Sequence, residues 1–168
     1  LDPRSVALGI TEWSLTVSSG AEHGKRYASA LRKTRAGLLD MVLVLFGACQ
    51  VTLGIVLAPR STELLSIKYE DISDDEFFLA FYSMKTGHGE HRRQDEVPLP
   101  KVALDMLLLL DRFHKSVGTS SHLLSVPGVR GGFSNSDEAL YEALDIFLDF
   151  IEIDLDSHGR RYYFRQHQ

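Results

Sequence analysis

Arg60 stands at the end of a long apolar stretch, and this position suggests that its side chain binds an anion. Residues 41–58 contain no charged side chain, and apolar residues return at helical spacing between Arg60 and Ile67. The guanidinium therefore emerges at the edge of a core, where a cation needs an anionic partner. One candidate partner is the carboxylate of Glu63, which would form a local ion pair. The other is a ligand anion such as phosphate, which a guanidinium can bind through two N–H groups.

Two further groups of polar residues follow. Lys85 lies in a polar stretch rich in Gly, His and Arg, between two segments with the composition of β-strands. Near the end of the chain, His158 and Arg161 are three residues apart, after Asp156 and Ser157, which are suitable residues to begin a helix. One helical face would then carry both His158 and Arg161.

In this order, the three groups resemble the motifs of the tyrosine recombinases, the phage-integrase family. The stretch Arg60-Ser-Thr-Glu-Leu-Leu, with Asp71 and Ile72 after it, is similar to the first arginine box of that family. Lys85-Thr-Gly, followed by Val-Pro-Leu-Pro at 97–100, resembles its hairpin lysine and exit strand. His158-Gly-Arg-Arg resembles its H-x-x-R box.

The resemblance covers about residue 40 to the end, with two departures. Ala58 and Pro59 stand where the family usually has a small residue, often glycine, and then an apolar one. Arg160 replaces the usual leucine before the second arginine.

The resemblance implies a metal-free transfer of a DNA phosphodiester to a tyrosine. Arg60 and Arg161 would stabilise negative charge on the non-bridging oxygens. Lys85 would protonate the leaving 5′-oxygen, and His158 would act as an acid–base or phosphate-positioning group. Glu63 would orient Arg60. No cofactor and no metal are implied.

Simpler interpretations remain open for several of these residues. Lys85 could be an ordinary hairpin lysine, and His158 could begin a helix without taking part in chemistry. Arg160 could be solvated or could contact a phosphate. The nucleophilic tyrosine of the family follows the H-x-x-R box by some tens of residues, and the sequence ends at Gln168. We therefore expect the nucleophile outside this chain and no cleavage by the chain alone.

Composition fits a soluble globular protein, but the net charge opposes DNA binding. The 168 residues are 44% hydrophobic and carry a formal charge of -5. The charge is uneven, because residues 1–38 hold six Lys or Arg and three Asp or Glu. That segment is +3 and the remainder is -8. Five of its basic residues form a cluster that is either a solvated helix face or a contact with the phosphate backbone: Lys25, Arg26, Arg32, Lys33 and Arg35.

The pattern of elements predicts a mainly α fold with a small antiparallel β-hairpin, similar to the catalytic domain of the recombinases. Residues 1–24 are expected to be a flexible N-terminal or linker segment, and 25–168 a C-terminally incomplete domain. The expected elements are a helix over 25–57, with a break near Gly47 or Gly54, a short helix capped by Ser61 or Thr62, a hairpin at 76–99, a helix over 101–115, a loop over 116–135 and a helix over 136–153.

The sequence gives no support for a metal site or a disulfide. Cys49 is the single cysteine and lies in an apolar run, which predicts a buried structural residue. The run at 41–58 contains Gln50 and is read as a core helix rather than a membrane span. We expect a cytoplasmic, nucleoid-associated protein of a bacterium, phage or other mobile element.

Two functions of different classes fit these observations best. The first is the catalytic domain of a site-specific recombinase or integrase, with double-stranded DNA as its partner. By resemblance it would be a monomer alone and a tetramer on DNA, without contact to a membrane. The second is a non-catalytic DNA-binding or regulatory relative. A third interpretation, a helical interaction module, is favoured by the acidic charge and disfavoured by the order of the three motifs.

Overall fold

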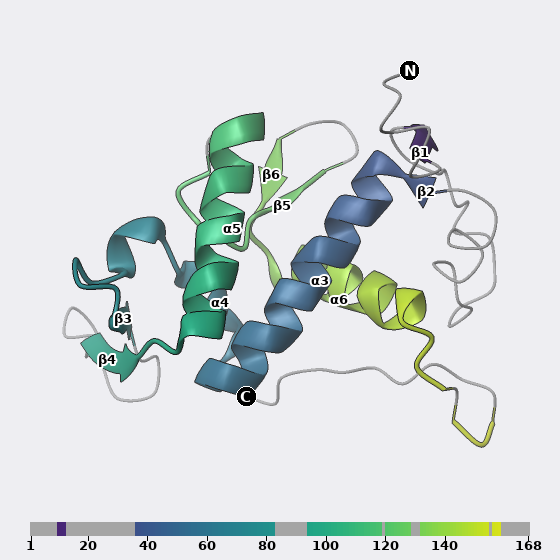
Figure 1. Ribbon diagram of the computed structural model, residues 1–168. Coiled ribbons are helices and arrows are strands. Elements are labelled where there is room, and N and C mark those ends of the chain that lie inside the picture. The colour runs from purple at the N-terminus through teal and green to yellow at the C-terminus, as the bar shows by residue number, and fades with distance from the viewer. Residues whose placement is uncertain are drawn as a thin grey trace.

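The computed structural model describes residues 10–12, 36–82, 94–118, 120–128, 132–154 and 156–158. These residues are mainly helical and contain two small antiparallel sheets, so the expected α+β class is confirmed (Figure 1). A short parallel pair of strands, β1 (Ile10–Glu12) and β2 (Ala36–Gly37), precedes the first helix. The expected flexible segment at 1–24 lies almost entirely outside the described residues.

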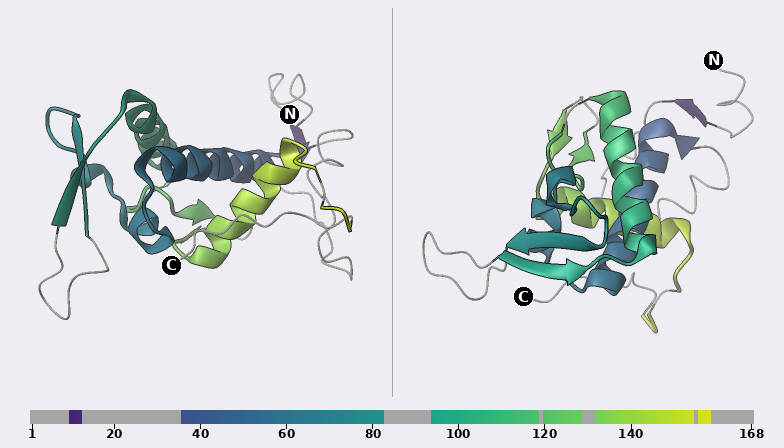
Figure 2. Two further views of the ribbon diagram at one scale, coloured as in Figure 1. Left: turned by 90° about the horizontal axis from the view of Figure 1, so that it is seen from below. Right: turned by 60° about the vertical axis from the view of Figure 1, so that its left-hand side comes forward.

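Helix α3 (Leu38–Leu57) is the central element of the fold. Figures 1 and 2 show it running through the middle of the molecule, with α6 (Asp137–Phe150) along one side and α5 (Lys101–Val117) on another. The expected break at Gly47 or Gly54 is wrong, because α3 is continuous over 20 residues. Gly47 instead allows a close helix contact: a Cβ there would lie 2.4 Å from the backbone oxygen of Ala143 in α6.

The helix α3 also passes a test of length and composition for a membrane span. Among the described residues it is the one helix that does so, with a mean hydropathy of 2.1 over its most apolar window. Half of that window is buried inside the protein, against the other helices and β5. The expectation of a core helix is supported by this burial of α3 against neighbouring elements.

A short helical stretch and a hairpin follow α3. Helix α4 (Ser61–Ser66) and the 3-10 turn η1 (Tyr69–Asp71) lead into β3 (Phe78–Tyr82), which pairs antiparallel with β4 (Gln94–Pro98). The hairpin confirms the expectation for residues 76–99, and α5 begins after Pro100, as expected. Because β3 and β4 pair, residues 83–93 form the connection between their ends, and Lys85 belongs to this connection, outside the described residues.

The segment between α5 and α6 contains a second small sheet that sequence analysis assigned to a loop. Strands β5 (Val126–Pro127) and β6 (Phe133–Ser134) pair antiparallel, and Gly128 N–H donates to the Gly132 carbonyl at 3.0 Å. Each strand has two residues, which is too short for an alternating pattern to appear in the sequence.

Helix α6 begins where the sequence indicated and ends slightly earlier. Ser136, the first residue of the expected helix, is its N-cap, and its hydroxyl accepts a hydrogen bond from Ala139 N–H at 3.3 Å. The helix ends at Phe150 rather than at Ile153. Farther on, Asp156 Oδ1 accepts from His158 N–H at 2.9 Å, and His158 lies in a turn. The rest of the helix expected to carry His158 and Arg161 falls outside the described residues.

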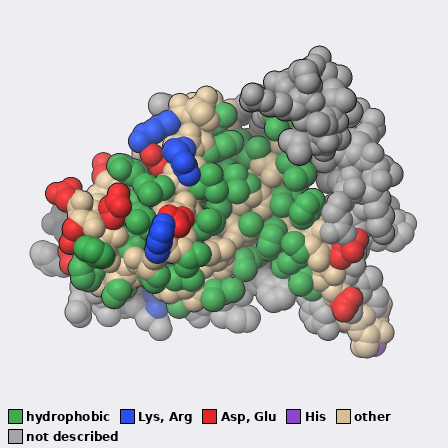
Figure 3. All heavy atoms as spheres, viewed as in Figure 1, with side chains coloured by type: hydrophobic (Ala, Val, Ile, Leu, Met, Phe, Trp, Pro, Cys, Tyr) green, Lys and Arg blue, Asp and Glu red, His purple; other side chains and the backbone are tan. Residues whose placement is uncertain are grey.

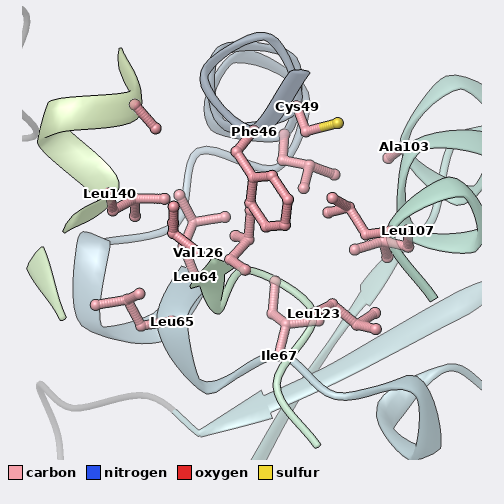
Figure 4. Close-up of a cluster of buried hydrophobic side chains, with 14 of the residues drawn as sticks. Phe46, Cys49, Leu64, Leu65, Ile67, Ala103, Leu107, Leu123, Val126 and Leu140 are labelled. Carbon is pink, nitrogen blue, oxygen red and sulfur yellow. The ribbon is translucent and has the colours of Figure 1, made fainter. Parts of the chain in front are cut away.

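The core forms where α3, α4, α5, α6 and the segment before β5 meet. Figure 4 shows Phe46 of α3 pointing into this cluster, toward side chains of the other elements. These side chains are between 0% and 3% exposed: Leu64, Ile67, Leu107, Leu123, Val126 and Leu140. Cys49 is also fully buried, and burial raises the pKa of its thiol to about 11. The interpretation of Cys49 as a structural residue is confirmed.

Candidate functional site: an arginine at the start of α4

The end of α3 determines the direction in which Arg60 leaves the core. Ala58 takes a left-handed conformation, with φ of 49°, and its N–H donates to the Gly54 carbonyl at 3.1 Å. Pro59 is buried, and Arg60 then adopts extended backbone angles before α4 begins. Ala58 thus takes a conformation that glycine adopts without strain, at the position where the recombinase motif usually has a small residue, often glycine.

Arg60 and Glu63 form a compact pair around the first turn of α4. Arg60 N–H donates to Glu63 Oε2 at 2.8 Å, and the Arg60 guanidinium lies 3.6 Å from Glu63 Oε1. The expected cap, Ser61 or Thr62, is wrong, because Arg60 is the N-cap residue and the Glu63 side chain satisfies its backbone N–H. The Glu63 side chain is 8% exposed and that of Arg60 is 24% exposed.

The guanidinium of Arg60 keeps most of its hydrogen-bonding capacity. It has five N–H donors, and across the described part of the chain its polar side-chain contact is the 3.6 Å approach to Glu63. At this distance the pair is an ion pair rather than a bidentate hydrogen bond. Glu63 therefore orients Arg60, and the remaining donors are able to bind an oxyanion at the protein surface.

Among the described residues, no other predicted site residue lies beside Arg60 at the start of α4. The segment that contains His158 lies beyond the end of α6, away from α4 in all three views of Figures 1 and 2. Lys85 and Arg161 lie outside the described residues, as does Arg160. The same holds for the basic cluster of Lys25, Arg26, Arg32, Lys33 and Arg35. The convergence of Arg60, Lys85, His158 and Arg161 on one concave face stays a prediction.

An acidic pocket that was not expected from the sequence begins ten residues after Arg60, at Glu70. It is about 390 Å³ in volume, between η1 and the outer face of the β3–β4 hairpin. Ile72, Phe78 and Ala80 contribute its apolar lining. Five carboxylates line it as well: Glu70, Asp71, Asp74, Asp75 and Glu96. Figure 3 shows acidic side chains gathered at the same end of the molecule.

The pocket has the wrong charge for a phosphate. The hydroxyl of Ser73 and then the backbone N–H of Phe77 donate to Asp75, and these bonds lower the pKa of the Asp75 carboxyl. Asp75 therefore stays ionised in neutral solution and repels a DNA backbone. The run Glu-Asp-Ile-Ser-Asp-Asp-Glu at 70–76 was the signal in the sequence, but the contribution of Glu96 depends on strand pairing.

Within the residues that the structure describes, no group of His, Cys, Asp and Glu is arranged to hold a metal ion. The site is therefore described by one arginine, its orienting carboxylate and a neighbouring acidic surface. Comparison of the chain with protein-family models, curated proteins and solved structures gave no match.

Proposed function

We propose that this chain is the core of a tyrosine-recombinase catalytic domain, which holds a DNA phosphodiester for attack by a tyrosine outside the chain. Its partner is double-stranded DNA, on which the protein assembles as a tetramer. The reaction needs no metal, because arginines supply the positive charge. The protein acts in the cytoplasm, on the DNA of a bacterium, phage or other mobile element.

The observation that carries this proposal is the geometry of Arg60. Its side chain is partly exposed at the rim of the core, oriented by Glu63 and left with unused N–H donors. An arginine that served only to neutralise Glu63 would be expected to donate short hydrogen bonds to its carboxylate. The observed separation of 3.6 Å is longer than such bonds. The spare donors are suited to the non-bridging oxygens of a phosphodiester.

The β3–β4 hairpin supports the second motif. Lys85 falls in the connection between two strands that pair antiparallel, as the resemblance requires of the lysine that protonates the leaving oxygen. Arg161 and His158 complete the proposed set, with Arg161 as the second clamp on the phosphate. Arg160 and the basic residues of 25–35 are proposed contacts to neighbouring phosphates.

A second candidate is a non-catalytic DNA-binding relative. The ion pair between Arg60 and Glu63 favours it, because this pair already gives the arginine a structural partner. The two candidates differ in one property, which is the ability to form a covalent bond to DNA.

A nicked suicide duplex distinguishes the two candidates. The 168-residue chain is compared with a version extended by the tyrosine-bearing segment that the resemblance implies, and covalent adducts are separated on denaturing gels. We expect an adduct from the extended protein and none from the chain alone, because the nucleophile creates the reaction route. No adduct from the extended protein would contradict the recombinase proposal and favour the non-catalytic relative. An adduct from the 168 residues alone would show that a tyrosine within the chain is the nucleophile, with Tyr162 and Tyr163 as the first candidates to replace.

Two variants of the extended protein test the role of Arg60. Arg60→Ala should slow adduct formation by about 100-fold to 1,000-fold, the effect of removing one strong oxyanion donor. Arg112→Ala is the matched control, because Arg112 is an exposed arginine of α5 and is expected to leave the rate unchanged. Equal rates for the two variants would remove Arg60 from the catalytic set.

A further inference from the structure

His114 is a buried histidine whose ring joins α5 to the segment 120–128. Its side chain belongs to the last turn of α5, and the residue is 3% exposed. Nε2 lies 3.0 Å from the carbonyl oxygen of Leu123. Because a carbonyl oxygen only accepts hydrogen bonds, Nε2 must carry a proton, and in the neutral ring Nδ1 is then the unprotonated nitrogen.

The surroundings of His114 favour this neutral form. Three aromatic rings enclose it, with centroids 5.9 Å away for Phe46, 5.6 Å for Phe113 and 4.9 Å for Phe133. Nδ1 is buried and has no hydrogen-bond partner among the described residues. A second proton would therefore create a buried N–H donor without an acceptor, as well as a buried charge.

The charged groups near His114 do not supply the missing acceptor. Asp111 lies one turn earlier on α5, and its carboxylate pairs with Lys115 at 2.7 Å. Lys115 in turn lies 4.7 Å from the ring of Tyr69 in η1. The segment 120–125 contributes His122, whose Nδ1 is 3.1 Å from the hydroxyl of Ser121. The side chains that α3 and β6 pack against the ring are phenylalanines, Phe46 and Phe133.

The Leu123 backbone connects this histidine to α4. Its N–H donates to the carbonyl of Ile67, the residue that ends α4, at 2.9 Å, while its own carbonyl accepts from His114. The Leu123 side chain is 2% exposed, in the core of Figure 4. Opening of the segment to hydrate a second ring N–H would therefore displace one residue that ties both α5 and α4 to the segment 120–128.

We propose that His114 and Leu123 form a proton-sensitive latch: the neutral imidazole ties segment 120–128 to α5, and protonation of the ring releases that segment. The proposal rests on the buried ring and its one carbonyl partner, and it does not depend on the function proposed above. Because Leu123 also contacts the end of α4, opening of the latch loosens the helix that follows Arg60.

The direction of the effect follows from proton linkage. Burial lowers the pKa of His114, and the hydrogen bond to Leu123 and the charge of Asp111 oppose that shift. In the open segment the ring returns to an ordinary pKa near 6.5. The latch is therefore fully stable above this pH and weakens as the pH falls below it. At pH 5.5, opening is favoured by up to about tenfold relative to pH 7.5.

Hydrogen–deuterium exchange of the complete chain at pH 7.5 and 5.5, corrected for intrinsic exchange rates, tests the latch. The amides of Leu123 and Ser125, which donate to Ile67 and His122, should lose up to about tenfold in protection at the lower pH. His114→Gln keeps an N–H donor that does not titrate, so its protection should not depend on pH. His122→Gln is the matched control, because it removes a neighbouring histidine that does not bind Leu123, and the pH dependence should persist.

Ring NMR of the unmodified chain provides a test that does not require the variants to fold. The Nδ1 and Nε2 resonances of His114 should show the neutral Nε2–H tautomer at pH 7.5, and loss of amide protection should follow protonation of this ring. Unchanged protection of 120–128 between the two pH values would overturn the proposal. A pH response that survives in His114→Gln, or disappears in His122→Gln, would overturn it as well.

Discussion

Two successive turns of the chain share the same hydrogen bond between a backbone N–H and a carboxylate, but they differ in burial and in neighbouring charge. At the first, Arg60 precedes α4 and its N–H donates to Glu63, three residues on, at 2.8 Å. At the second, Lys68 precedes η1 and its N–H donates to Asp71, again three residues on, at 2.7 Å. Each turn thus begins with a cationic residue whose backbone is held by a carboxylate.

The two cationic side chains then differ in burial and in their neighbours. The Arg60 side chain turns back toward a carboxylate that is 8% exposed, and its spare donors remain at the rim of the core. The Lys68 ammonium instead pairs at 3.2 Å with Glu70, which is 74% exposed, beside the acidic pocket. We therefore expect a phosphate to be favoured at the first turn and repelled at the second. The comparison shows that burial and neighbouring charge, rather than the shape of the turn, create a candidate anion site.

The largest expected difference between the turns concerns phosphoryl transfer. In the extended protein, Arg60→Ala should raise the barrier to adduct formation by about 3 to 4 kcal/mol, because it removes a donor to the developing charge. Lys68→Ala should change the rate less than twofold. Single-turnover rates on the nicked duplex measure both, and a larger loss for Lys68→Ala would reverse the comparison.

The next difference concerns stability. Glu63→Gln should lower the free energy of unfolding by about 1 to 2 kcal/mol, because it leaves the partly buried Arg60 without its counter-charge. Asp71→Asn should cost less than about 1 kcal/mol, since its surroundings are more exposed and the amide oxygen can still accept from Lys68. Urea unfolding at pH 7 provides the values. Equal decreases in the free energy of unfolding for the two variants would mean that burial of the first turn contributes little to stability.

A smaller change in stability is expected from substitutions at two backbone positions, one before the first turn and one after the second. Ala58 before the first turn and Glu76 after the second both have positive φ, 49° and 61°. Replacing either residue by glycine relieves a left-handed strain of about 1 to 2 kcal/mol and increases the entropy of the unfolded chain. We expect a net gain of about 0.5 to 1 kcal/mol for Ala58→Gly and for Glu76→Gly. Ala48→Gly, in the interior of α3, is the control and should destabilise by about 1 kcal/mol.

The smallest effect belongs to the acidic pocket. Neutralising Asp74 and Glu96 together, by Asp74→Asn and Glu96→Gln, should raise the affinity for duplex DNA about twofold at low salt, because their repulsion acts over a distance comparable to the Debye length. The gain should disappear at 0.5 M salt. Fluorescence anisotropy with a labelled duplex measures it. A loss of affinity would show that the pocket side contributes to DNA binding rather than opposing it.

The apolar part and the end of helix α3, the β3–β4 hairpin, α5 and the start of α6 could be predicted from the sequence, because each has a clear local signal. The run at 41–58 has no charges, β3 is rich in aromatic residues, and Ser136 is a strong N-cap. The helix expected from residue 25 is wrong at Ala36 and Gly37, which form β2, so that α3 begins only at Leu38. The break at Gly47 was wrong for a tertiary reason: the glycine is needed for contact with α6, which no local pattern reveals. The β5–β6 pair was too short to leave a pattern.

For the site, the sequence indicated Arg60 and its relation to Glu63, but not the details of the contact. The cap at Arg60 depends on which carboxylate reaches the backbone, and Ser61 and Thr62 are stronger cap formers by type. The acidic pocket needs Glu96 to pair across from Ala80, which depends on strand register. The burial of His114 could not be predicted locally, because its ring contacts Leu123, nine residues away, and Phe133, which lies farther along the chain.

We propose that Arg60 binds a DNA phosphate and that Lys68 does not, and the salt dependence of duplex binding separates the two residues. Affinities of the unmodified chain, Arg60→Ala and Lys68→Ala are measured by anisotropy between 50 and 200 mM salt. Each lost phosphate contact reduces the slope of log K against log salt by about 0.9. We expect this reduction for Arg60→Ala and an unchanged slope for Lys68→Ala. An unchanged slope for Arg60→Ala would contradict the account.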